Sequence, residues 1–498
     1  MELSEIRKNI DNIDDSMLDL FLKRMELSRK AAEYKSARGM AILNEGRERE
    51  ILDDASSKSG EMAEYARRFF AGILELSRDY QLSLSDAPIY GLLGRKLGHS
   101  LSPMIHRELG NLDYRLFELE PEELADFLRK TNIGGLNVTI PYKLTVMKYL
   151  DNISPEAADV GAVNTIVNRG GRLCGYNTDV VGFLYMVKRA EIELSGKKVV
   201  VLGSGGASKT AVYCAKKLGA SEVTVISRSG EDNYTNLSRH ADAEIIVNCT
   251  PVGMYPNNGQ SPVDLTAFPR CRGVIDVIYN PMRTALIMQA ESLGIPCAGG
   301  LAMLTAQAHR AAELFFDKSI EDDIIDVIAG KIAAQCENIV LIGMPGSGKT
   351  TIGGLLGRIT GRPVCEIDKM IAQTADKSIP AIFAEDGEDA FRQLEHDAVC
   401  QAGKNGGGII VTGGGVVTRE ENYEPLHQNG RIYRVERDVA ALATDGRPLS
   451  KDIDTVKAMY EARKPMYDRF ADVTVDNNGT AEAAAEAIWR DFNENSHY

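Results

Sequence analysis

Two glycine-rich loops, each directly after an apolar run, constrain the fold of this 498-residue chain most strongly. "VLGSGGASKTA" covers residues 201–211, and "GMPGSGKTT" covers residues 343–351. A glycine loop between a strand and a helix binds phosphate groups through backbone N–H groups at the helix N-terminus. Because one nucleotide site rarely needs two such loops, the sequence predicts two separate α/β domains, each with its own nucleotide.

Residues 1–84 have a different, helical pattern and contain no proline. Their apolar side chains recur every three or four residues. This spacing predicts one helix of more than 30 residues before Gly39 and two further helices near residues 46–57 and 61–82. The first part of the chain is therefore predicted to be an all-α domain, followed by a linker at residues 83–88.

The rest of the chain alternates between strand-like apolar runs and helical stretches, which favours α/β domains with parallel sheets. We place one α/β domain at residues 88–335, closed by a helical stretch near 304–334, and a second at residues 337–498. The predicted fold class is multidomain: an all-α domain, an α/β domain with a Rossmann-type nucleotide site, and an α/β P-loop domain.

Charge and cysteine usage narrow the functional classes. The net charge of −14 disfavours a nucleic-acid partner, because a phosphate backbone would be repelled. The eight cysteines are scattered without a C-x-x-C pair, which is typical of reduced cytoplasm rather than of a disulfide framework or a zinc site. No apolar run approaches the ~18 residues of a membrane span, and the charged N-terminus does not resemble a signal peptide. We therefore expect a cytoplasmic protein that acts on small molecules, with no nucleic-acid or membrane partner.

The later loop matches the P-loop pattern G-x-x-x-x-G-K-[ST] in full and follows the apolar run "NIVLIG". In this pattern Lys349 reaches the β- and γ-phosphates, and the Thr350 hydroxyl binds Mg²⁺. The sequence thus predicts ATP with Mg²⁺. The expected nucleotide-binding residues are Gly343, Gly346, Ser347, Gly348, Lys349, Thr350 and Thr351.

Charged residues further along this domain indicate the phosphate acceptor. Glu366 and Asp368 follow an expected strand, where alternate residues share a face. Arg392 and Arg463, taken alone, would be surface charges. Together with an aspartate, they would suit an acceptor that carries a carboxylate and hydroxyls.

Residues 337–498 resemble shikimate kinase along nearly their whole length. The resemblance implies that Asp368 contacts the shikimate hydroxyls, that Arg447 in "DGRPLS" is the lid arginine, and that Glu366, where the family usually has Asp, acts on Mg²⁺ through water. It also implies a carboxylate site and a pocket wall, formed by Arg392, Arg463, Gly413, Gly414 and Gly415.

The earlier loop reads G-x-G-G-A, which by itself is also compatible with a simple tight turn. The next apolar run, "VTVIS", leads into Arg228 between two serines rather than into an acidic residue. A cation and hydroxyls at this point suit a 2′-phosphate, so NADP(H) is favoured over NAD. The predicted cofactor residues are Gly203, Gly205, Gly206, Ala207, Ser227, Arg228 and Ser229.

Residues 89–335 resemble shikimate dehydrogenase throughout, on the motifs "GHSLSPMIH", "GGLNVTIPYK", "GAVNTI", "GYNTDVVGF" and "GGLAMLTAQA". The resemblance implies that residues 88–190 are mainly substrate-binding, that 191–300 form the NADP-binding Rossmann part, and that 301–335 form C-terminal helices. It implies a shikimate site made of Ser100, Ser102, Thr139, Asn164, Tyr279 and Gln307, with Thr250 beside the nicotinamide.

The same resemblance makes Lys143 and Asp179 the catalytic pair of the dehydrogenase. Without the surrounding motif, Lys143 would be an ordinary exposed lysine. The chemistry needs such a pair, because hydride addition to a ketone leaves an alkoxide that requires a proton donor.

Basic residues on the first predicted helix indicate a ligand site in residues 1–84. Arg24 and Lys35 are 11 residues apart and share a face within about 20°, whereas Arg7 points about 100° away. The segment resembles the all-helical chorismate mutases over its whole length, with Asn44 where that family often has Asp. The resemblance implies a ligand site formed by Arg7, Arg24, Lys35, Arg47, Glu48, Ser77 and Gln81.

Chorismate rearranges to prephenate in one step without a cofactor, so such a site has to hold a compact dicarboxylate and stabilise charge on its ether oxygen. Lys35 and Gln81 would donate to that oxygen, and Glu48 would accept from the ring hydroxyl. The alternative is that residues 1–84 form only a dimerisation or regulatory arm. A more distant alternative is a regulatory protein whose three domains bind ligands without turnover. We expect a homodimer through the N-terminal helices, and with the mutase interpretation we expect Arg7 to enter the partner's site.

Overall fold

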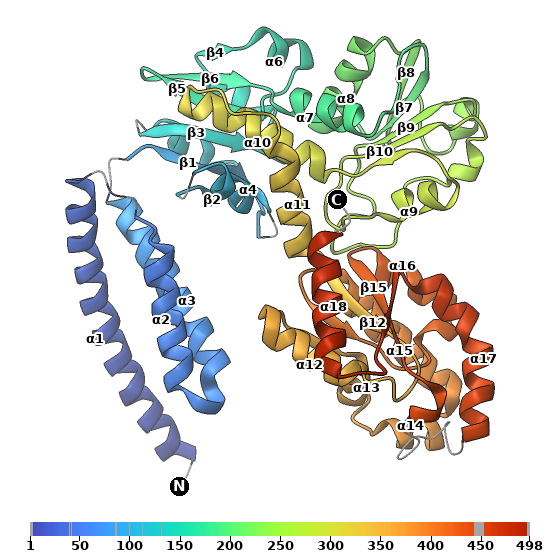
Figure 1. Ribbon diagram of the computed structural model, residues 1–498. Helices are drawn as coiled ribbons and strands as arrows, with labels where there is room; N and C mark the ends of the chain where they lie inside the picture. The colour runs from blue at the N-terminus through green and yellow to red at the C-terminus, as the bar shows by residue number, and fades with distance from the viewer. Residues whose placement is uncertain are drawn as a thin grey trace. The chain divides into compact units, whose positions relative to one another are not determined.

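The computed structural model describes residues 3–38, 40, 42–84, 87–98, 100–111, 113–130, 132–442 and 453–495, and Figure 1 labels their helices and strands. The chain forms two compact units. The first unit comprises residues 1–154, 163–176 and 314–316, and the second comprises residues 155–162, 177–313 and 317–498. The expected lid residue Arg447 lies outside the described residues, so its role stays a prediction.

Three helices form the N-terminal part of the first unit, in the order α1 (Leu3–Ser36), α2 (Glu45–Lys58), the 3₁₀ turn η1 (Gly60–Met62) and α3 (Ala63–Ser83). Asn44 begins α2, because its side-chain oxygen accepts a hydrogen bond from the backbone N–H of Arg47 at 3.0 Å. Both α1 and α2 pack against α3 (Figure 1). Of the residues of α1, only Ser28 and Ala32 are buried. These helices agree with those expected from the hydrophobic spacing.

The remainder of the first unit is a six-stranded sheet in the order β2-β1-β3-β5-β6-β4. Its strands are β1 (Ile89–Gly94), β2 (Arg115–Glu118), β3 (Ile133–Val138), β4 (Asn152–Ile153), β5 (Thr165–Arg169) and β6 (Arg172–Tyr176). The helices beside it are α4 (Ser102–Glu108), α5 (Leu124–Leu128) and the 3₁₀ helix η2 (Thr145–Tyr149).

This first sheet is mixed rather than parallel. β1 pairs in parallel with β2 and β3, whereas β5 runs antiparallel to both β3 and β6. The hairpin between β5 and β6 turns at Gly170 and Gly171, whose φ angles are +62° and +87°. Two adjacent glycines with positive φ let the chain reverse directly. The expectation of a parallel sheet is therefore wrong here.

The second unit contains two five-stranded sheets, both fully parallel. The first has the order β11-β10-β9-β7-β8, with strands β7 (Lys198–Leu202), β8 (Glu222–Ile226), β9 (Ile245–Asn248), β10 (Gly273–Asp276) and β11 (Cys297–Ala298). Its helices are α6 (Pro155–Val160), α7 (Asp179–Arg189), α8 (Gly206–Lys217), η3 (Leu237–His240), η4 (Leu265–Ala267), α9 (Ala285–Ser292), α10 (Leu301–Phe316) and α11 (Ile324–Cys336). The helical stretch expected near 304–334 is two helices, because Asp317 ends α10 in the left-handed conformation.

The other parallel sheet has the order β13-β14-β12-β15-β16. Its strands are β12 (Asn338–Ile342), β13 (Val364–Glu366), β14 (Ile409–Val411), β15 (Gly430–Glu436) and β16 (Val473–Asp476). Its helices are α12 (Lys349–Thr360), α13 (Ile367–Ala375), α14 (Ile379–Glu385), α15 (Gly387–Lys404), η5 (Val416–Thr418), η6 (Glu420–Asn422), α16 (Tyr423–His427), η7 (Val439–Ala441), α17 (Ile453–Phe470) and α18 (Ala481–Glu494). Every residue of the central strand β12 is buried, as expected where helices cover both faces of a sheet.

Polar contacts join the part of the second unit that contains strands β7–β11 to the part that contains strands β12–β16. We call these contacts the junction. On one side of it, α11 ends at Cys336 and β12 begins at Asn338. Arg362 donates hydrogen bonds to the carbonyl oxygens of Ala334 and Glu337, which lie at the C-terminal end of α11. These bonds occupy carbonyl groups that a helix end leaves without an internal partner.

The other side of the junction is a loop that precedes α9. The backbone N–H of Met282 donates to Oδ1 of Asn429 at 3.0 Å, and that of Arg283 donates to the carbonyl oxygen of Gln428 at 3.0 Å. The Arg283 guanidinium also donates to the carbonyl oxygen of His427 at 2.7 Å. Arg283, Gln428 and Asn429 are all buried.

Among the described residues, no helix is both long and apolar enough to cross a membrane.

Candidate active sites

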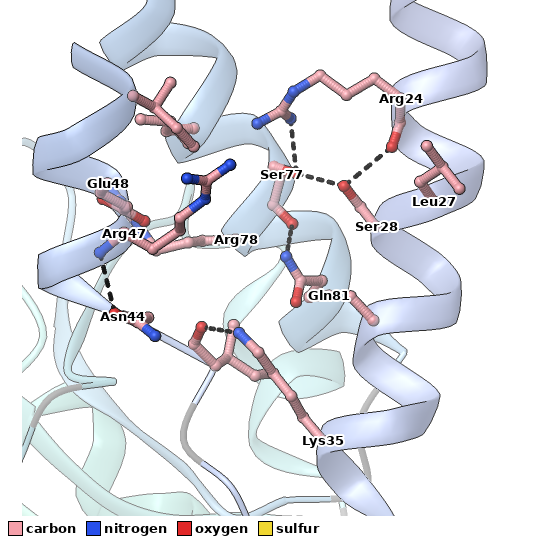
Figure 2. A pocket seen from close by; sticks show the side chains of 14 residues that line it. Arg24, Leu27, Ser28, Lys35, Asn44, Arg47, Glu48, Ser77, Arg78 and Gln81 are labelled. Carbon is pink, nitrogen blue, oxygen red and sulfur yellow. Dashed lines mark hydrogen bonds and ion pairs between the residues drawn. The ribbon is translucent and has the colours of Figure 1, made fainter. Parts of the chain in front are cut away.

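A pocket of about 270 Å³ lies among the three N-terminal helices (Figure 2). It brings together all but one of the residues predicted for the helical domain: Arg24 and Lys35 from α1, Arg47 and Glu48 from α2, and Ser77 and Gln81 from α3. The exception is Arg7, which is exposed and is not among the residues that line the pocket. Arg78, which the sequence analysis did not include, also lines it.

Ser77 is the centre of the hydrogen bonds on the α1 side of this pocket. Arg24 donates to its hydroxyl oxygen at 2.9 Å, and the hydroxyl groups of Ser28 and Ser77 bond to each other. Gln81 donates through Nε2 to the carbonyl oxygen of Ser77 at 3.2 Å, which leaves its buried Oε1 without a partner among the described residues. Gln81 therefore presents an acceptor oxygen to a ligand here, and donation from Nε2 to a ligand would require that Nε2 give up its bond to Ser77.

The α2 side of the pocket carries the acidic group. Glu48 forms an ion pair with Arg78, which reaches across from α3 (Figure 2). Partial burial lowers the pKa of Arg24, and the negative charge of Glu48 acts in the opposite direction. Lys35 donates to the carbonyl oxygen of Ile42. The pocket is thus lined by several cations around one carboxylate.

The P-loop between β12 and α12 is tightly held. Gly343 has a φ of +145°, and a Cβ there would lie 2.4 Å from the carbonyl oxygen of Val435. Gly348 has a φ of +99°, and a Cβ there would lie 2.4 Å from Nδ2 of Asn477. Neither position accepts a side chain, since both the backbone conformation and the space exclude it.

Lys349 lies inside this loop, only 7% exposed, and donates to the carbonyl oxygens of Gly343 and Met344 at 2.8 and 3.0 Å. The hydroxyl of Ser347 is buried and has no partner among the described residues. A buried hydroxyl without a partner, beside a lysine held by loop carbonyls at a helix N-terminus, fits a nucleotide phosphate.

The residues predicted to bind the phosphate acceptor adjoin this loop after β14. A Cβ on Gly413 would lie 2.9 Å from Asp368 Oδ1 and 3.0 Å from Glu395 Oε1, so the two carboxylates meet there. A Cβ on Gly414 would lie 2.5 Å from the ring of Pro345, within the P-loop. The Gly413–Gly415 segment therefore connects the carboxylates to the phosphate loop.

Two arginines face the same glycine segment. Arg392 forms a 2.7 Å ion pair with Glu395, whose side chain is only 1% exposed, and its guanidinium would lie 2.2 Å from a Cβ on Gly415. Arg463 donates to the carbonyl oxygen of Gly414 at 2.9 Å. Burial raises the pKa of Glu395, Arg392 opposes the rise, and Asp368 adds to it.

The positions of the two acidic residues near β13 differ from those that the sequence predicted. Glu366 is the last residue of β13, but Asp368 lies in the first turn of α13, so the two are not alternate residues of one strand. Glu366 forms a 2.6 Å ion pair with Lys369. Its role toward Mg²⁺ stays a prediction.

The Rossmann loop between β7 and α8 is more open than the P-loop. Gly203 has a φ of +106°, and a Cβ there would lie 3.1 Å from the carbonyl oxygen of Cys249. Gly205 begins α8 in an extended conformation with no atom within 4 Å of a Cβ position. Gly206 and Ala207 form the first turn of α8. Ser227, Arg228 and Ser229 follow β8 directly, and Arg228 is exposed. An open helix N-terminus with a cation at the end of the next strand fits a dinucleotide with a 2′-phosphate.

A buried aspartate fixes the cofactor-side loops. Asp276, at the end of β10, accepts from Asn248 at 3.1 Å and from the Thr284 hydroxyl at 2.7 Å. Asn248 in turn accepts from the hydroxyl and the N–H of Thr250 at 2.7 and 3.0 Å. Burial raises the pKa of Asp276 to about 6. The loop with Tyr279 runs between Asp276 and Thr284, so the bond between these two residues closes it.

In the first unit, a polar network centred on Asn137 in β3 reaches Asn164, which was predicted to bind substrate. Asn137 Oδ1 accepts from Tyr114 at 2.8 Å and lies 3.0 Å from His106 Nε2, and its Nδ2 donates to Thr165 at 3.2 Å. Thr165 donates to Oδ1 of Asn164 at 3.1 Å. Burial lowers the pKa of His106 to about 3, so this ring is neutral. The network orients the Asn164 amide.

The remaining dehydrogenase residues are held by their local elements. Ser102, the first residue of α4, donates its N–H to the Ser100 hydroxyl at 3.2 Å. Thr139 donates its N–H to Leu93, and the Lys143 carbonyl accepts from Val163. In the second unit, buried Asp179 begins α7 after Thr178, and the Thr178 hydroxyl donates to Gln307 at 3.3 Å. Lys143 and Asp179 belong to different units, so their pairing stays a prediction.

Sequence reasoning missed several of these polar groups. Arg78 and Glu395 are each one helical turn from a predicted residue, at Gln81 and Arg392, and that spacing was the available signal. Asp276 and His106 carry no such signal, because their partners come from distant segments. The helical pocket, the Rossmann loop and the P-loop with its acceptor site together define a multifunctional enzyme.

Comparisons with known proteins agree with this class. Three family models match the chain in order: chorismate mutase type II at residues 6–82, the shikimate dehydrogenase substrate binding domain at 92–166, and shikimate kinase at 345–493. The chain is therefore a fusion of these three domains.

Individual known proteins match the middle part of the chain over almost their whole length. Shikimate dehydrogenase (NADP(+)) of Clostridium perfringens (strain SM101 / Type A) is 35% identical over 263 residues, which cover 48% of this chain and 97% of that protein. The enzyme of the same name from Caldanaerobacter subterraneus subsp. tengcongensis is 36% identical over 279 residues, covering 50% and 99%. A solved chorismate mutase/shikimate 5-dehydrogenase fusion protein from Clostridium acetobutylicum is 38% identical, covering 49% of this chain and 97% of that one, with a TM-score of 0.47. The chain belongs to the shikimate dehydrogenase family.

Proposed function

We propose that the chain catalyses three reactions of aromatic amino acid biosynthesis. These are NADPH-dependent reduction of 3-dehydroshikimate to shikimate, ATP-dependent phosphorylation of shikimate to shikimate 3-phosphate, and rearrangement of chorismate to prephenate. The observation that best supports catalysis is the contact of the Gly413–Gly415 segment with both the P-loop and the paired carboxylates of Asp368 and Glu395. This contact supports an acceptor hydroxyl that binds beside the phosphoryl donor.

In the kinase site, Asp368 binds the shikimate hydroxyls, including the one that attacks the γ-phosphate of ATP. Arg392 and Arg463 bind the shikimate carboxylate, since both face Gly413–Gly415, and Glu395 orients Arg392 through their ion pair. Lys349 neutralises charge on the phosphates. Arg447, outside the described residues, stays the predicted lid arginine. Mg²⁺ bound near Thr350 and Glu366 would supply further neutralisation of that charge.

In the dehydrogenase site, Lys143 donates a proton to the substrate oxygen and Asp179 holds Lys143 in its charged form. Bound NADPH supplies the hydride. Arg228 with Ser227 and Ser229 binds its 2′-phosphate, and the N-terminus of α8 with Gly203, Gly205, Gly206 and Ala207 binds the pyrophosphate. Thr250 would contact the nicotinamide half of the cofactor. Shikimate is held by Ser100, Ser102, Thr139, Asn164, Tyr279 and Gln307.

In the mutase site, no cofactor takes part. Arg24 and Arg47 bind substrate carboxylates, Lys35 and Gln81 donate to the breaking ether oxygen, and Glu48 accepts from the ring hydroxyl. Ser77 holds Arg24 through their 2.9 Å hydrogen bond.

We also infer a homodimer that forms through the N-terminal helices. Apolar side chains all along α1 are exposed, from Leu3 (60%) to Leu27 (64%). A second copy of α1 would cover them, since an exposed apolar stripe of this length favours self-association. Arg7 then enters the partner's pocket. The eight cysteines are free thiols, which supports a cytoplasmic location.

The proposed activities are tested by three assays on the full chain: NADPH oxidation with 3-dehydroshikimate, ADP release with shikimate, and chorismate loss. Loss of the first two activities would overturn the proposal. Loss of the third alone would leave the N-terminal helices as a dimerisation arm.

The shared mutase site is tested by complementation. Arg7→Ala and Lys35→Ala dimers should each be nearly inactive as mutases, while a mixed dimer places both changes in one site and leaves the other unaltered. Co-refolding the two variants should restore activity toward one working site per mixed dimer. Mixtures that exchange subunits yet stay inactive would refute the shared site.

A further inference from the structure

Arg78 is the cation on the α3 wall of the mutase pocket, and its side chain reaches Glu48 on α2. It lies next to Ser77 and one turn before Gln81 on α3. Its side chain is 30% exposed, and the side chain of its partner Glu48 is 21% exposed. The only hydrogen bond of this guanidinium to another described residue uses Nη1. The fork of Nε and Nη2 is thus available to a ligand.

Arg47 borders the same pocket but has a different partner. Its guanidinium forms a 2.9 Å ion pair with Glu50 one turn along α2, and its side chain is 67% exposed. Water screens a contact between an exposed arginine and an anion, so a carboxylate contact from Arg47 is weaker than one from a more buried arginine in the same pocket. The α2–α3 wall therefore has its better-shielded cation at Arg78 rather than at Arg47.

The charge of the pocket also favours a second residue that binds a substrate carboxylate. Four cationic residues line it against the single carboxylate of Glu48, and the proposed substrate carries two carboxylates. Arg24 is bound to Ser77 on the α1 side. A dicarboxylate that spans the pocket needs a second bidentate partner on the opposite wall, and a guanidinium offers that geometry where Lys35 does not.

We propose that Arg78 binds one carboxylate of the substrate through its free guanidinium edge, while its other edge holds Glu48 in position for the ring hydroxyl. This inference rests on the proposed mutase function. It makes Arg78 both a substrate-binding residue and the positioning residue for Glu48. It also accounts for the position of the one acidic group in a cationic pocket.

The competing interpretation is a structural ion pair that only ties α3 to α2. The chain contains a matched control for it. Arg67 on α3 forms a 2.9 Å ion pair with Asp53 on α2, and neither residue lines the mutase pocket. Arg67→Met removes the same kind of cross-helix bridge without touching the proposed site.

The test measures chorismate mutase kinetics of the full chain for the unaltered protein, Arg78→Met, Arg78→Lys and Arg67→Met. Arg78→Met should raise KM about 10- to 100-fold, because a charge-assisted hydrogen bond to the substrate is lost. It should also lower kcat, since Glu48 loses its support. Arg78→Lys keeps the charge without the fork and should recover part of KM but little of kcat. Arg67→Met should leave both constants within about twofold.

Each of these results either supports or overturns the role of Arg78. A KM for Arg78→Met within about twofold of the unaltered chain overturns the inference, as does an equal change in Arg67→Met. Dehydrogenase activity and thermal unfolding of each variant report on folding. If Arg78→Met fails to fold, the KM of Arg78→Lys still decides, since an unchanged value would refute a bidentate contact. An unaltered chain that lacks mutase activity overturns the proposed mutase function, and this inference with it.

Discussion

The two glycine loops of this chain are built in opposite ways. The P-loop closes on itself: Lys349 is buried and donates to two loop carbonyls, and a side chain on Gly343 or Gly348 would collide with Val435 or Asn477. In the Rossmann loop, Gly205 faces open space and the nearest predicted cation, Arg228, is exposed. Lys209, the lysine of that loop sequence, donates to the carbonyl oxygen of Gly161 at 3.2 Å rather than to carbonyl groups of its own loop.

The difference shows which contacts fix the geometry and the specificity of each nucleotide site. The P-loop is preorganised, so its geometry is fixed by contacts inside the protein before any nucleotide binds. The Rossmann loop offers an open helix N-terminus, so its specificity depends on a side chain beyond the loop. The following predictions test this contrast.

The largest expected effect is at the lysine of the closed loop. Lys349→Ala should lower shikimate phosphorylation by about 10³-fold or more, because charge on the transferred phosphoryl group is no longer stabilised. The dehydrogenase rate should stay within about twofold, since its own loop is intact. Both rates are measured on the same preparation, with Lys349→Met to separate lost packing from lost charge. Loss of both activities in a folded variant would contradict two independent sites.

The next effect concerns the lysine of the dehydrogenase, which lies outside its glycine loop. Lys143→Ala should lower kcat for 3-dehydroshikimate reduction by about 10²-fold or more, while NADPH binding is retained, because proton donation is lost. Steady-state kinetics and NADPH fluorescence titration separate the two quantities. A near-normal kcat would remove Lys143 from the chemical step.

A smaller effect is expected at the end of β8. Arg228→Asp should weaken NADPH binding by about 1.5–3 kcal/mol, or roughly 10- to 100-fold, because a charge-assisted contact to the 2′-phosphate is lost and repulsion is added. NADH use should suffer less. The ratio of kcat/KM for the two cofactors is the measurement, and an unchanged ratio would refute specificity by Arg228.

The smallest effect compares the loops without any ligand. Gly348→Ala should lower the free energy of unfolding by about 1–3 kcal/mol, since a side chain there is strained and meets Asn477. Gly205→Ala should change it by less than about 0.5 kcal/mol, because that position is extended and open. Denaturant unfolding of the two variants checks this. Equal costs at the two positions would mean that the loops do not differ as described.

Much of the fold could be predicted from hydrophobic spacing. The three N-terminal helices and the strands before both glycine loops follow from local patterns, because burial of one face imposes a period. The β5–β6 hairpin was missed, since its Gly170–Gly171 turn gives only a short signal between short strands. Asp368 was placed by a strand argument, yet the chain turns into α13 immediately after Glu366.

The candidate sites were predictable to a different degree. Family motifs supplied the residues that touch ligands, and six of the seven helical-domain residues line one pocket. The groups that orient them were not found: Glu395 behind Arg392, Asp276 behind Thr250, and Arg78 beside Glu48. Glu395 lies three residues after Arg392 on α15, so their spacing was an available signal. The other two partners are brought together by tertiary contact, which a sequence pattern does not carry.

The junction has a consequence for how this chain can be divided. A cut between the dehydrogenase and the kinase would fall at Glu337, which is fully buried and whose carbonyl is bound by Arg362. It would also strip the loop before α9 of its bonds to Gln428 and Asn429. Two chains made by such a cut would lose the bonds that hold Arg283 and Arg362, so each part would have to hydrate these groups or bind the other part again to recover the native contacts.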